Sequence, residues 1–187
     1  FRARRVTARV EGLDKATVED MSAVHAERVS IPAQTYLRLI ETVEPIDDLS
    51  ARGKEALAGW DGTMDLDSAA AAIYSAFRLH LNRTVVGSIL GPIAEDAVSA
   101  LGRGAPRHVG QIEVAIMDAA SEGDTSMLPP GADWDSLLAK ALAEGVAYLN
   151  ERLGDDLEAW EWGKVHHTRP RHTLSESFPA LARLLDP

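Results

Sequence analysis

The longest helical pattern in the sequence runs from Ser68 to about Leu90, and it sets the framework that the rest of the chain must fit. Its large apolar residues recur every four positions, which places them on one face of a helix. An alanine run at its start, Ala69 to Ala72, would let a neighbouring helix approach closely. Asp67 is the expected N-cap, and Gly91-Pro92 is the expected stop. The apolar face consists of Ile73, Phe77, Leu81 and Val85.

Further helical patterns fill most of the remaining chain. Thr17-Val18-Glu19-Asp20 is a capping pattern, in which the threonine hydroxyl can accept a hydrogen bond from an early helical amide. Pro32 lies inside the run that follows and should kink or divide it, because proline removes one intrahelical hydrogen bond. Ser50 and Asp133 are the expected caps of two later helices. The expected helical ranges are 17 to about 42, 50–57, 93–101, 109–120 and 134–153, with Gly154 ending the last one.

The composition supports a mainly α fold. Alanine is abundant, whereas valine, isoleucine and aromatic residues never gather into the alternating runs typical of strands. Trp60-Asp61-Gly62 is expected to be a turn, because Asp-Gly tolerates a positive φ. We expect a helical domain over 1–158 and an irregular segment rich in tryptophan and histidine over 159–187. Loops are expected at 102–106 and 127–131, an extended or irregular stretch at 160–170, and a last helical turn or two at 178–185.

Charge and residue usage exclude several classes of function. The formal net charge of −10 argues against a nucleic acid partner, since phosphate binding needs a basic surface. With no cysteine in the chain, disulfides and thiol catalysis are excluded. No apolar run approaches the roughly 18–20 residues of a membrane span, and no apolar segment follows the basic N-terminus as in a signal peptide. Because a natural chain starts with methionine, Phe1 indicates processing or truncation.

The sequence contains no familiar catalytic motif. His166, His167 and His172 lie close together, but their spacing is not that of a zinc site and no carboxylate completes a set, so we expect structural histidines and no metal. The same applies to His25, His80 and His108, which lie on or beside predicted helices. Neither a nucleophile elbow nor a phosphate-binding loop is present. From the residues alone, the chain is a helical domain of unknown role.

Two tryptophan segments and two N-terminal motifs nevertheless occur in a specific order. We call Gly59-Trp60-Asp61-Gly62 the first tryptophan signature and Trp160 to His166 the second. Before them come the arginine-rich stretch Phe1 to Val6 and a Thr-x-Glu-Asp-Met helix start at Thr17 to Met21. Together they resemble the penicillin acylase family of N-terminal-nucleophile (Ntn) hydrolases, in the β chain, and the order and spacing agree across nearly all 187 residues.

That resemblance implies a mechanism whose central residues lie outside this sequence. Family members cleave a precursor and expose an N-terminal serine, which attacks an amide carbonyl and forms an acyl-enzyme. Backbone amides and an asparagine stabilise the oxyanion. Neither that serine nor that asparagine matches a residue here, and the calcium site of some members would also fall outside. The chain would then be the helical lobe of an Ntn-hydrolase β chain, inactive alone, with its C-terminal stretch returning toward the missing core.

The resemblance assigns a supporting role to one arginine. Arg5 resembles the arginine that supports the hydrogen-bond network around the oxyanion asparagine, and Arg4 is the alternative if the match slips by one residue. The competing interpretation is that Arg2, Arg4, Arg5 and Arg9 form a solvated basic face. The remaining signature residues are expected to dock the lobe on the catalytic core without touching substrate, since tryptophans anchor and glycines permit close approach. These docking residues are Trp60, Gly62, Trp162, Gly163 and His166.

Two functions from different classes remain open. In the first, the chain belongs to a periplasmic or extracellular acylase that cleaves an amide between an acyl group and a small amine. The substrate could be a β-lactam, an acyl-homoserine lactone or a lipopeptide, and the partners would be the remaining α- and β-chain portions. In the second, the chain is a stand-alone helical binding or interaction module. An isolated lobe would expose an apolar patch near its N-terminal stretch and around 160–174, and could self-associate.

Overall fold

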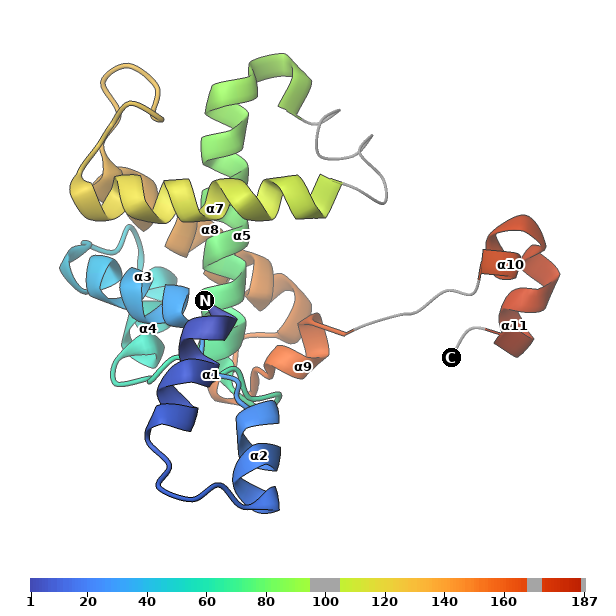
Figure 1. The fold of residues 1–187 in the computed structure, drawn as a ribbon. Helices are drawn as coiled ribbons and strands as arrows, with labels where there is room; N and C mark the ends of the chain where they lie inside the picture. The colour runs from blue at the N-terminus through green and yellow to red at the C-terminus, as the bar shows by residue number, and fades with distance from the viewer. Residues whose placement is uncertain (95–104, 168–172, 186–187) are drawn as a thin grey trace.

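A computed structural model describes residues 1–94, 105–167 and 173–185, and these residues form a helical protein (Figure 1). The helices are α1 (Arg2–Glu11), α2 (Val18–His25), α3 (Ile31–Thr42), α4 (Asp48–Leu57), α5 (Ala69–Leu90), α7 (Ala105–Glu122), α8 (Trp134–Leu153), α9 (Trp162–Val165), α10 (Thr173–Ser177) and α11 (Ala182–Leu185). Short 3-10 turns lie at Gly91–Ile93, Leu157–Ala159 and Pro179–Leu181. The only β-pairing among the described residues is one antiparallel bridge between Val29 and Thr63. The predicted mainly α class is confirmed.

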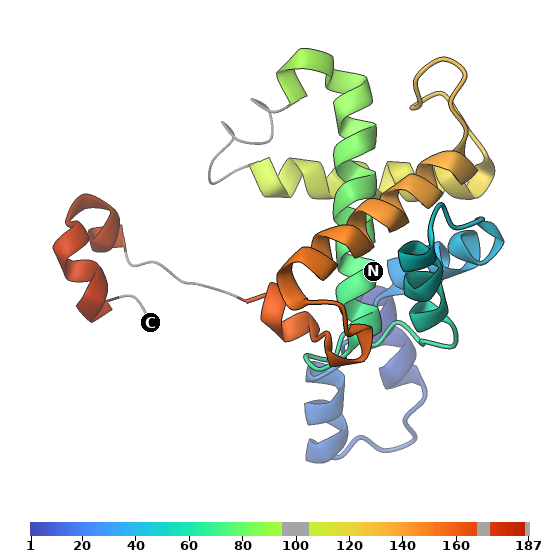
Figure 2. The same cartoon turned by 180° about the vertical axis from the view of Figure 1, so that it is seen from behind.

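Helix α5 is the central element, with α7 crossing it on one side and α8 on the other (Figures 1 and 2). Its predicted apolar face is completely buried: Ile73, Phe77, Leu81 and Val85 have no exposed surface. Tyr36 of α3 packs against α5, with its ring centroid 5.6 Å from that of Phe77 in an edge-on arrangement. The core therefore lies along α5.

Glycine brings α8 closest to α5. A Cβ atom at Gly145 would lie 2.7 Å from the backbone nitrogen of Phe77, so only glycine fits at this crossing. The alanine run of α5 predicted that a neighbouring helix approaches closely, but it did not indicate a glycine on that neighbour. The residue that makes it possible is on the partner helix.

Several helix boundaries follow their predicted caps and others shift. The hydroxyl of Thr17 accepts from the amide of Asp20 at 3.1 Å, and Asp133 accepts from Ser136 at 2.8 Å, as expected. Pro32 divides two helices, because it lies in the first turn of α3. The caps of α4 and α5 are corrections. Asp47, three residues before Ser50, caps α4, and Ser68 caps α5 in place of Asp67.

The irregular and terminal stretches also differ from the expectation. Helix α1 was not predicted, and α7 begins at Ala105, inside the expected loop and before Val109. The stretch from 160 to 170, expected to be extended or irregular, contains the one-turn helix α9. The expected turns at 178–185 are present and contact α10. Most of the segment expected at 93–101, and His172, lie outside the described residues. No described helix is long and apolar enough to cross a lipid bilayer.

Candidate functional site

Arg5 lies on α1 and pairs with an acidic residue from the link between α2 and α3. Its Nη2 is 3.1 Å from Oε2 of Glu27, and Nε of Arg9, one turn later on α1, is 3.4 Å from the same oxygen. Oε1 of Glu27 accepts a hydrogen bond from the amide of Val29 at 3.1 Å. Arg5 and Arg9 therefore share one carboxylate, which ties α1 to the start of α3.

The contacts of this carboxylate favour its charged form. Burial acts to raise the pKa of Glu27, but the Val29 amide and the guanidinium groups of Arg5 and Arg9 outweigh it, so that the pKa lies below its usual value. Arg2, Arg4 and Arg9 are exposed, as a solvated basic face requires, whereas the side chain of Arg5 is only 28% exposed. Nε of Arg5 is buried and has no hydrogen-bond partner among the described residues.

Arg5 lines a groove of about 440 Å³ between α1, the start of α3, α5 and α7. A second ion pair closes its far wall, where Nε of Arg78 lies 2.9 Å from Oε1 of Glu113. Burial raises the pKa of Glu113, and the charge of Arg78 only partly offsets this effect. Four arginines and two glutamates line the groove, and three of the arginines are in ion pairs: Arg5 with Glu27, Arg28 with Asp65 and Arg78 with Glu113. Its lining residues are Phe1, Arg2, Arg5, Val6, Glu27, Arg28, Val29, Ser30, Ile31, Pro32, Arg78, Glu113 and Val114.

The groove contains one candidate nucleophile, and that group is used structurally. Ser30 caps α3, and its hydroxyl accepts from the amide of Ala33 at 3.3 Å. Among the described residues, no group of three or more histidine or acidic side chains is placed to hold a metal ion. The arrangement can orient an acceptor or stabilise negative charge, but its described residues supply no activated nucleophile.

The first tryptophan signature is anchored by contacts within this chain. The indole N–H of Trp60 donates to the carbonyl of Thr63 at 3.1 Å, and its ring centroid lies 5.6 Å from that of Tyr74 on α5. Gly62 has a φ of 89°, as the predicted turn requires, and its carbonyl accepts from the amide of Ser30 at 2.8 Å. The signature therefore joins the segment that leads from Glu27 into α3.

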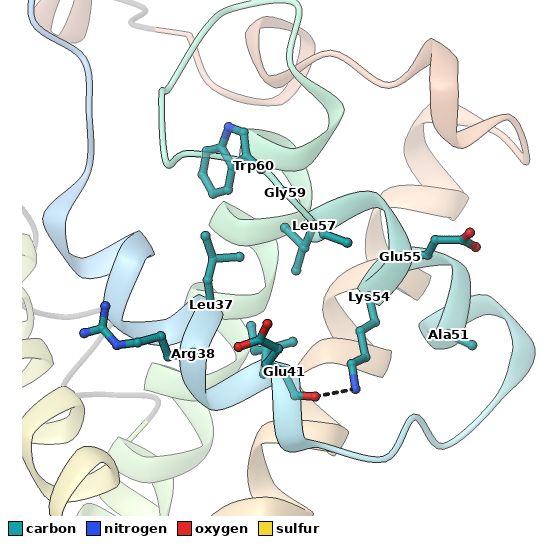
Figure 3. Close-up of a pocket in the computed structure, with 11 residues that line it drawn as sticks. Leu37, Arg38, Glu41, Ala51, Lys54, Glu55, Leu57, Gly59 and Trp60 are labelled. Carbon is teal, nitrogen blue, oxygen red and sulfur yellow. Dashed lines mark hydrogen bonds between the residues drawn. The ribbon is translucent and has the colours of Figure 1, made fainter.

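Trp60 also borders a hollow of about 490 Å³ between α3 and α4 (Figure 3). One polar group of its lining, the Lys54 ammonium, is already hydrogen-bonded. Nζ of Lys54 donates to the carbonyls of Glu41 at 2.9 Å and Val43 at 2.7 Å, and so satisfies the C-terminal end of α3. This hollow carries no constellation of chemical groups comparable to that of the Arg5 groove.

The second tryptophan signature packs against the loop that follows the first. The rings of Trp162 and His166 are stacked, with centroids 4.5 Å apart and planes 7° apart. The amide of Gly163 donates to the carbonyl of Leu66 at 2.7 Å, and a Cβ atom at Gly163 would lie 3.2 Å from that oxygen. The second signature thus contacts the chain just before α5, and the segment from Glu27 to Ser30 links Arg5 to the first signature.

The prediction missed two residues of this region. Trp160 is completely buried, and its indole N–H donates to the carbonyl of Gly154 at 2.8 Å, although its segment was expected to be irregular. Glu27 was not considered, because no local pattern links it to Arg5, twenty-two residues earlier. The remaining histidines have ordinary contacts. Nδ1 of His80 is 3.4 Å from Glu144, and Nδ1 of His167 is 3.2 Å from the carbonyl of Gly163. His25 is exposed, and the side chain of His108 lies outside the described residues.

Comparison with known proteins identifies the class of this chain: it is a member of the penicillin amidase family, which it matches over residues 1–185. It is 32% identical to the penicillin acylase 2 proenzyme of Pseudomonas sp. (strain SE83), over 100% of this chain and 23% of that proenzyme. It is 30% identical to the acyl-homoserine lactone acylase QuiP of Pseudomonas aeruginosa, over 70% of this chain and 16% of that protein. The chain therefore spans about a quarter of the length of the penicillin acylase 2 proenzyme and a smaller share of QuiP.

Proposed function

We propose that this chain is the helical lobe of a longer acylase that hydrolyses the amide between an acyl group and a small amine. The observation that carries the proposal is the match to penicillin acylase 2 proenzyme, which extends over the whole of this chain at 32% identity. The nucleophile would be a serine exposed at a new N-terminus by cleavage of the precursor, and its own α-amine would act as the general base. That serine lies in a part of the acylase other than these residues.

Within this enzyme, Arg5 supports the asparagine that stabilises the oxyanion. The support for this role is the position of Arg5, whose partly exposed side chain lines the groove and is held there by Glu27. The lobe contributes positioning and charge, while bond formation belongs to the serine. The docking role of Trp60, Gly62, Trp162, Gly163 and His166 is part of the same proposal, in which the lobe packs on the remaining α- and β-chain portions. Calcium, where present, would be bound by those portions.

The names of the relatives supply the candidate substrates. One is a penicillin acylase and others are acyl-homoserine lactone acylases, so β-lactam amides and acyl-homoserine lactones are the first substrate classes to test, followed by lipopeptides. We place the full-length enzyme in the periplasm or outside the cell, by analogy with the family.

The test compares the full-length precursor with the isolated 187-residue chain. The precursor should cleave itself, expose an N-terminal serine detectable by mass spectrometry, and release free amine from an acylated β-lactam or homoserine lactone. The isolated chain should release none, because it lacks the nucleophile. Robust turnover by the isolated chain would refute the proposal. A precursor that neither cleaves itself nor releases amine would favour the stand-alone interaction module.

A further inference from the structure

Glu27 occupies a junction between three helices. It follows α2, precedes α3 and reaches across to α1, and its side chain is only 10% exposed. Its two carboxylate oxygens have separate partners, because Oε2 faces Arg5 and Arg9 while Oε1 accepts from the Val29 amide. A carboxylate with this little exposure is tolerated when its charge is paired and its oxygens are hydrogen-bonded. Glu27 therefore has a fixed position, set from both sides.

A fixed Glu27 also determines where Arg5 points. The guanidinium group is planar, and its N–H donors diverge at fixed angles, so holding Nη2 sets the direction of the other donors. Nε of Arg5 is buried without a hydrogen-bond partner among the described residues, and Arg5 lines the groove. The side chain as a whole is 28% exposed, so part of it is open to the groove.

We infer that Glu27 is a positioning residue, which holds Arg5 by Nη2 so that the guanidinium donors that remain open to the groove are presented to an acceptor carried by another part of the acylase. The inference rests on the proposed function and deepens it. Arg9 is the second cation that neutralises Glu27 and leaves Arg5 free to use its other donors. Glu27 itself touches no substrate. Its contribution to turnover passes entirely through Arg5.

The experiment uses the full-length, self-cleaved enzyme and an acylated substrate that it hydrolyses. Glu27→Gln keeps the shape of the side chain but removes the charge that pairs with Arg5 and Arg9. It should lower kcat by about 10- to 100-fold with KM nearly unchanged, as expected when a group near the reacting centre is misplaced. Glu27→Asp, which keeps the charge, should recover most of kcat. The double variant Glu27→Gln with Arg5→Lys should be no slower than Arg5→Lys alone, because both changes disrupt the same interaction between Glu27 and Arg5.

Glu19→Gln is the matched control, since Glu19 is exposed on α2 and makes no ion pair among the described residues. Rates are divided by the concentration of reactive serine, from an acylation burst, and the Tm of each variant is recorded. If Glu27→Gln lowers Tm but leaves kcat per reactive serine unchanged, Glu27 is purely structural and the inference is wrong. If Arg5→Lys lowers kcat and Glu27→Gln does not, the inference fails while the proposed function stands. A wild-type precursor that releases no amine would overturn the proposed function, and the inference with it.

Discussion

The hydroxyl of Ser68 accepts a hydrogen bond from the amide of Ala71 at 3.1 Å, and α5 begins there. Replacing Ser68 with alanine removes the acceptor and leaves an early amide of the central helix without its cap. We expect Ser68→Ala to lower the free energy of unfolding by about 1 kcal/mol. Asp67→Ala is the matched change one residue earlier, and should cost less than about 0.5 kcal/mol, since Asp67 is exposed. Urea unfolding measures both. A larger loss at Asp67 would mean that it is the cap.

Single residues were the hardest feature to predict. Aspartate and serine are both good N-caps, so propensity cannot choose between Asp67 and Ser68, or between Asp47 and Ser50. In each case the backbone conformation decides, and that depends on how the preceding loop packs. Glu27 was missed for a different reason. Glu27 contacts Arg5 although the two residues are 22 positions apart, and no sequence periodicity predicts such a contact. Arg5 itself was found only through resemblance.

At the level of elements, the crossing of α5 and α8 depends on a missing side chain. A Cβ atom at Gly145 would lie 2.7 Å from the nitrogen of Phe77 and 2.9 Å from the carbonyl carbon of Ala76, and backbone atoms cannot rotate away. Gly145→Ala should therefore force the helices apart and lower the free energy of unfolding by about 1–3 kcal/mol.

Gly87 of α5 provides the control for that substitution. It is also a helical glycine, but a Cβ atom there would meet nothing within 4 Å. Gly87→Ala should raise stability by about 0.5–1 kcal/mol, because alanine loses less backbone freedom in a helix. Thermal unfolding followed by circular dichroism distinguishes the two. Equal effects at Gly145 and Gly87 would show that helix propensity, rather than packing, governs the crossing.

Long elements were predictable and short ones were not. The 22 residues of α5 and the 20 of α8 contain several turns of apolar periodicity, which is enough to define a buried face. Helix α9 has four residues, too few for a periodicity, and the Gly163 amide fixes its start on the carbonyl of Leu66. Helix α1 has no buried residue, so its pattern of apolar and polar residues does not correspond to a buried face.

For the whole molecule, aspartates at helix caps and in turns make the free energy of unfolding depend on pH. Hydrogen bonds from backbone amides and hydroxyls hold the pKa of five aspartates below the usual 3.8. Their contribution is therefore present above pH 3.8 and is lost as the pH falls through the lower folded values. Glu113 acts in the opposite sense. Its raised pKa gives stability that is complete below the unfolded value and lost as the pH rises through the folded value. The five aspartates are Asp20, Asp47, Asp61, Asp124 and Asp133.

Because the aspartates outnumber Glu113, we expect the urea midpoint of the isolated chain to fall steadily between pH 4 and pH 2. The double variant Asp47→Asn with Asp133→Asn keeps both capping oxygens but removes two titrating groups, so its midpoint should fall less steeply over this interval. Identical slopes for the variant and the wild type would contradict the assignment. Measurement at constant ionic strength separates this effect from repulsion between like charges.

The helical class was predictable for the whole molecule because most of its sequence follows one periodicity. The exposed apolar surface was less predictable from the sequence. Phe1, Val10 and Leu174 are exposed large apolar residues in the two regions where an apolar patch was expected, and self-association of the isolated chain stays a prediction. Apolar periodicity predicts which face of a helix is buried within this chain, but not what covers the opposite face.

The position of α8 in the core has a consequence for biosynthesis. Helices α3, α4 and α5 all pack against α8, which lies more than forty residues beyond the end of α5 in the chain. During translation, the earlier helices must leave the ribosome with their apolar faces uncovered until α8 emerges. Such a delay exposes a nascent chain to aggregation and to chaperones. We therefore expect these helices to reach their final packing only after α8 has been synthesised.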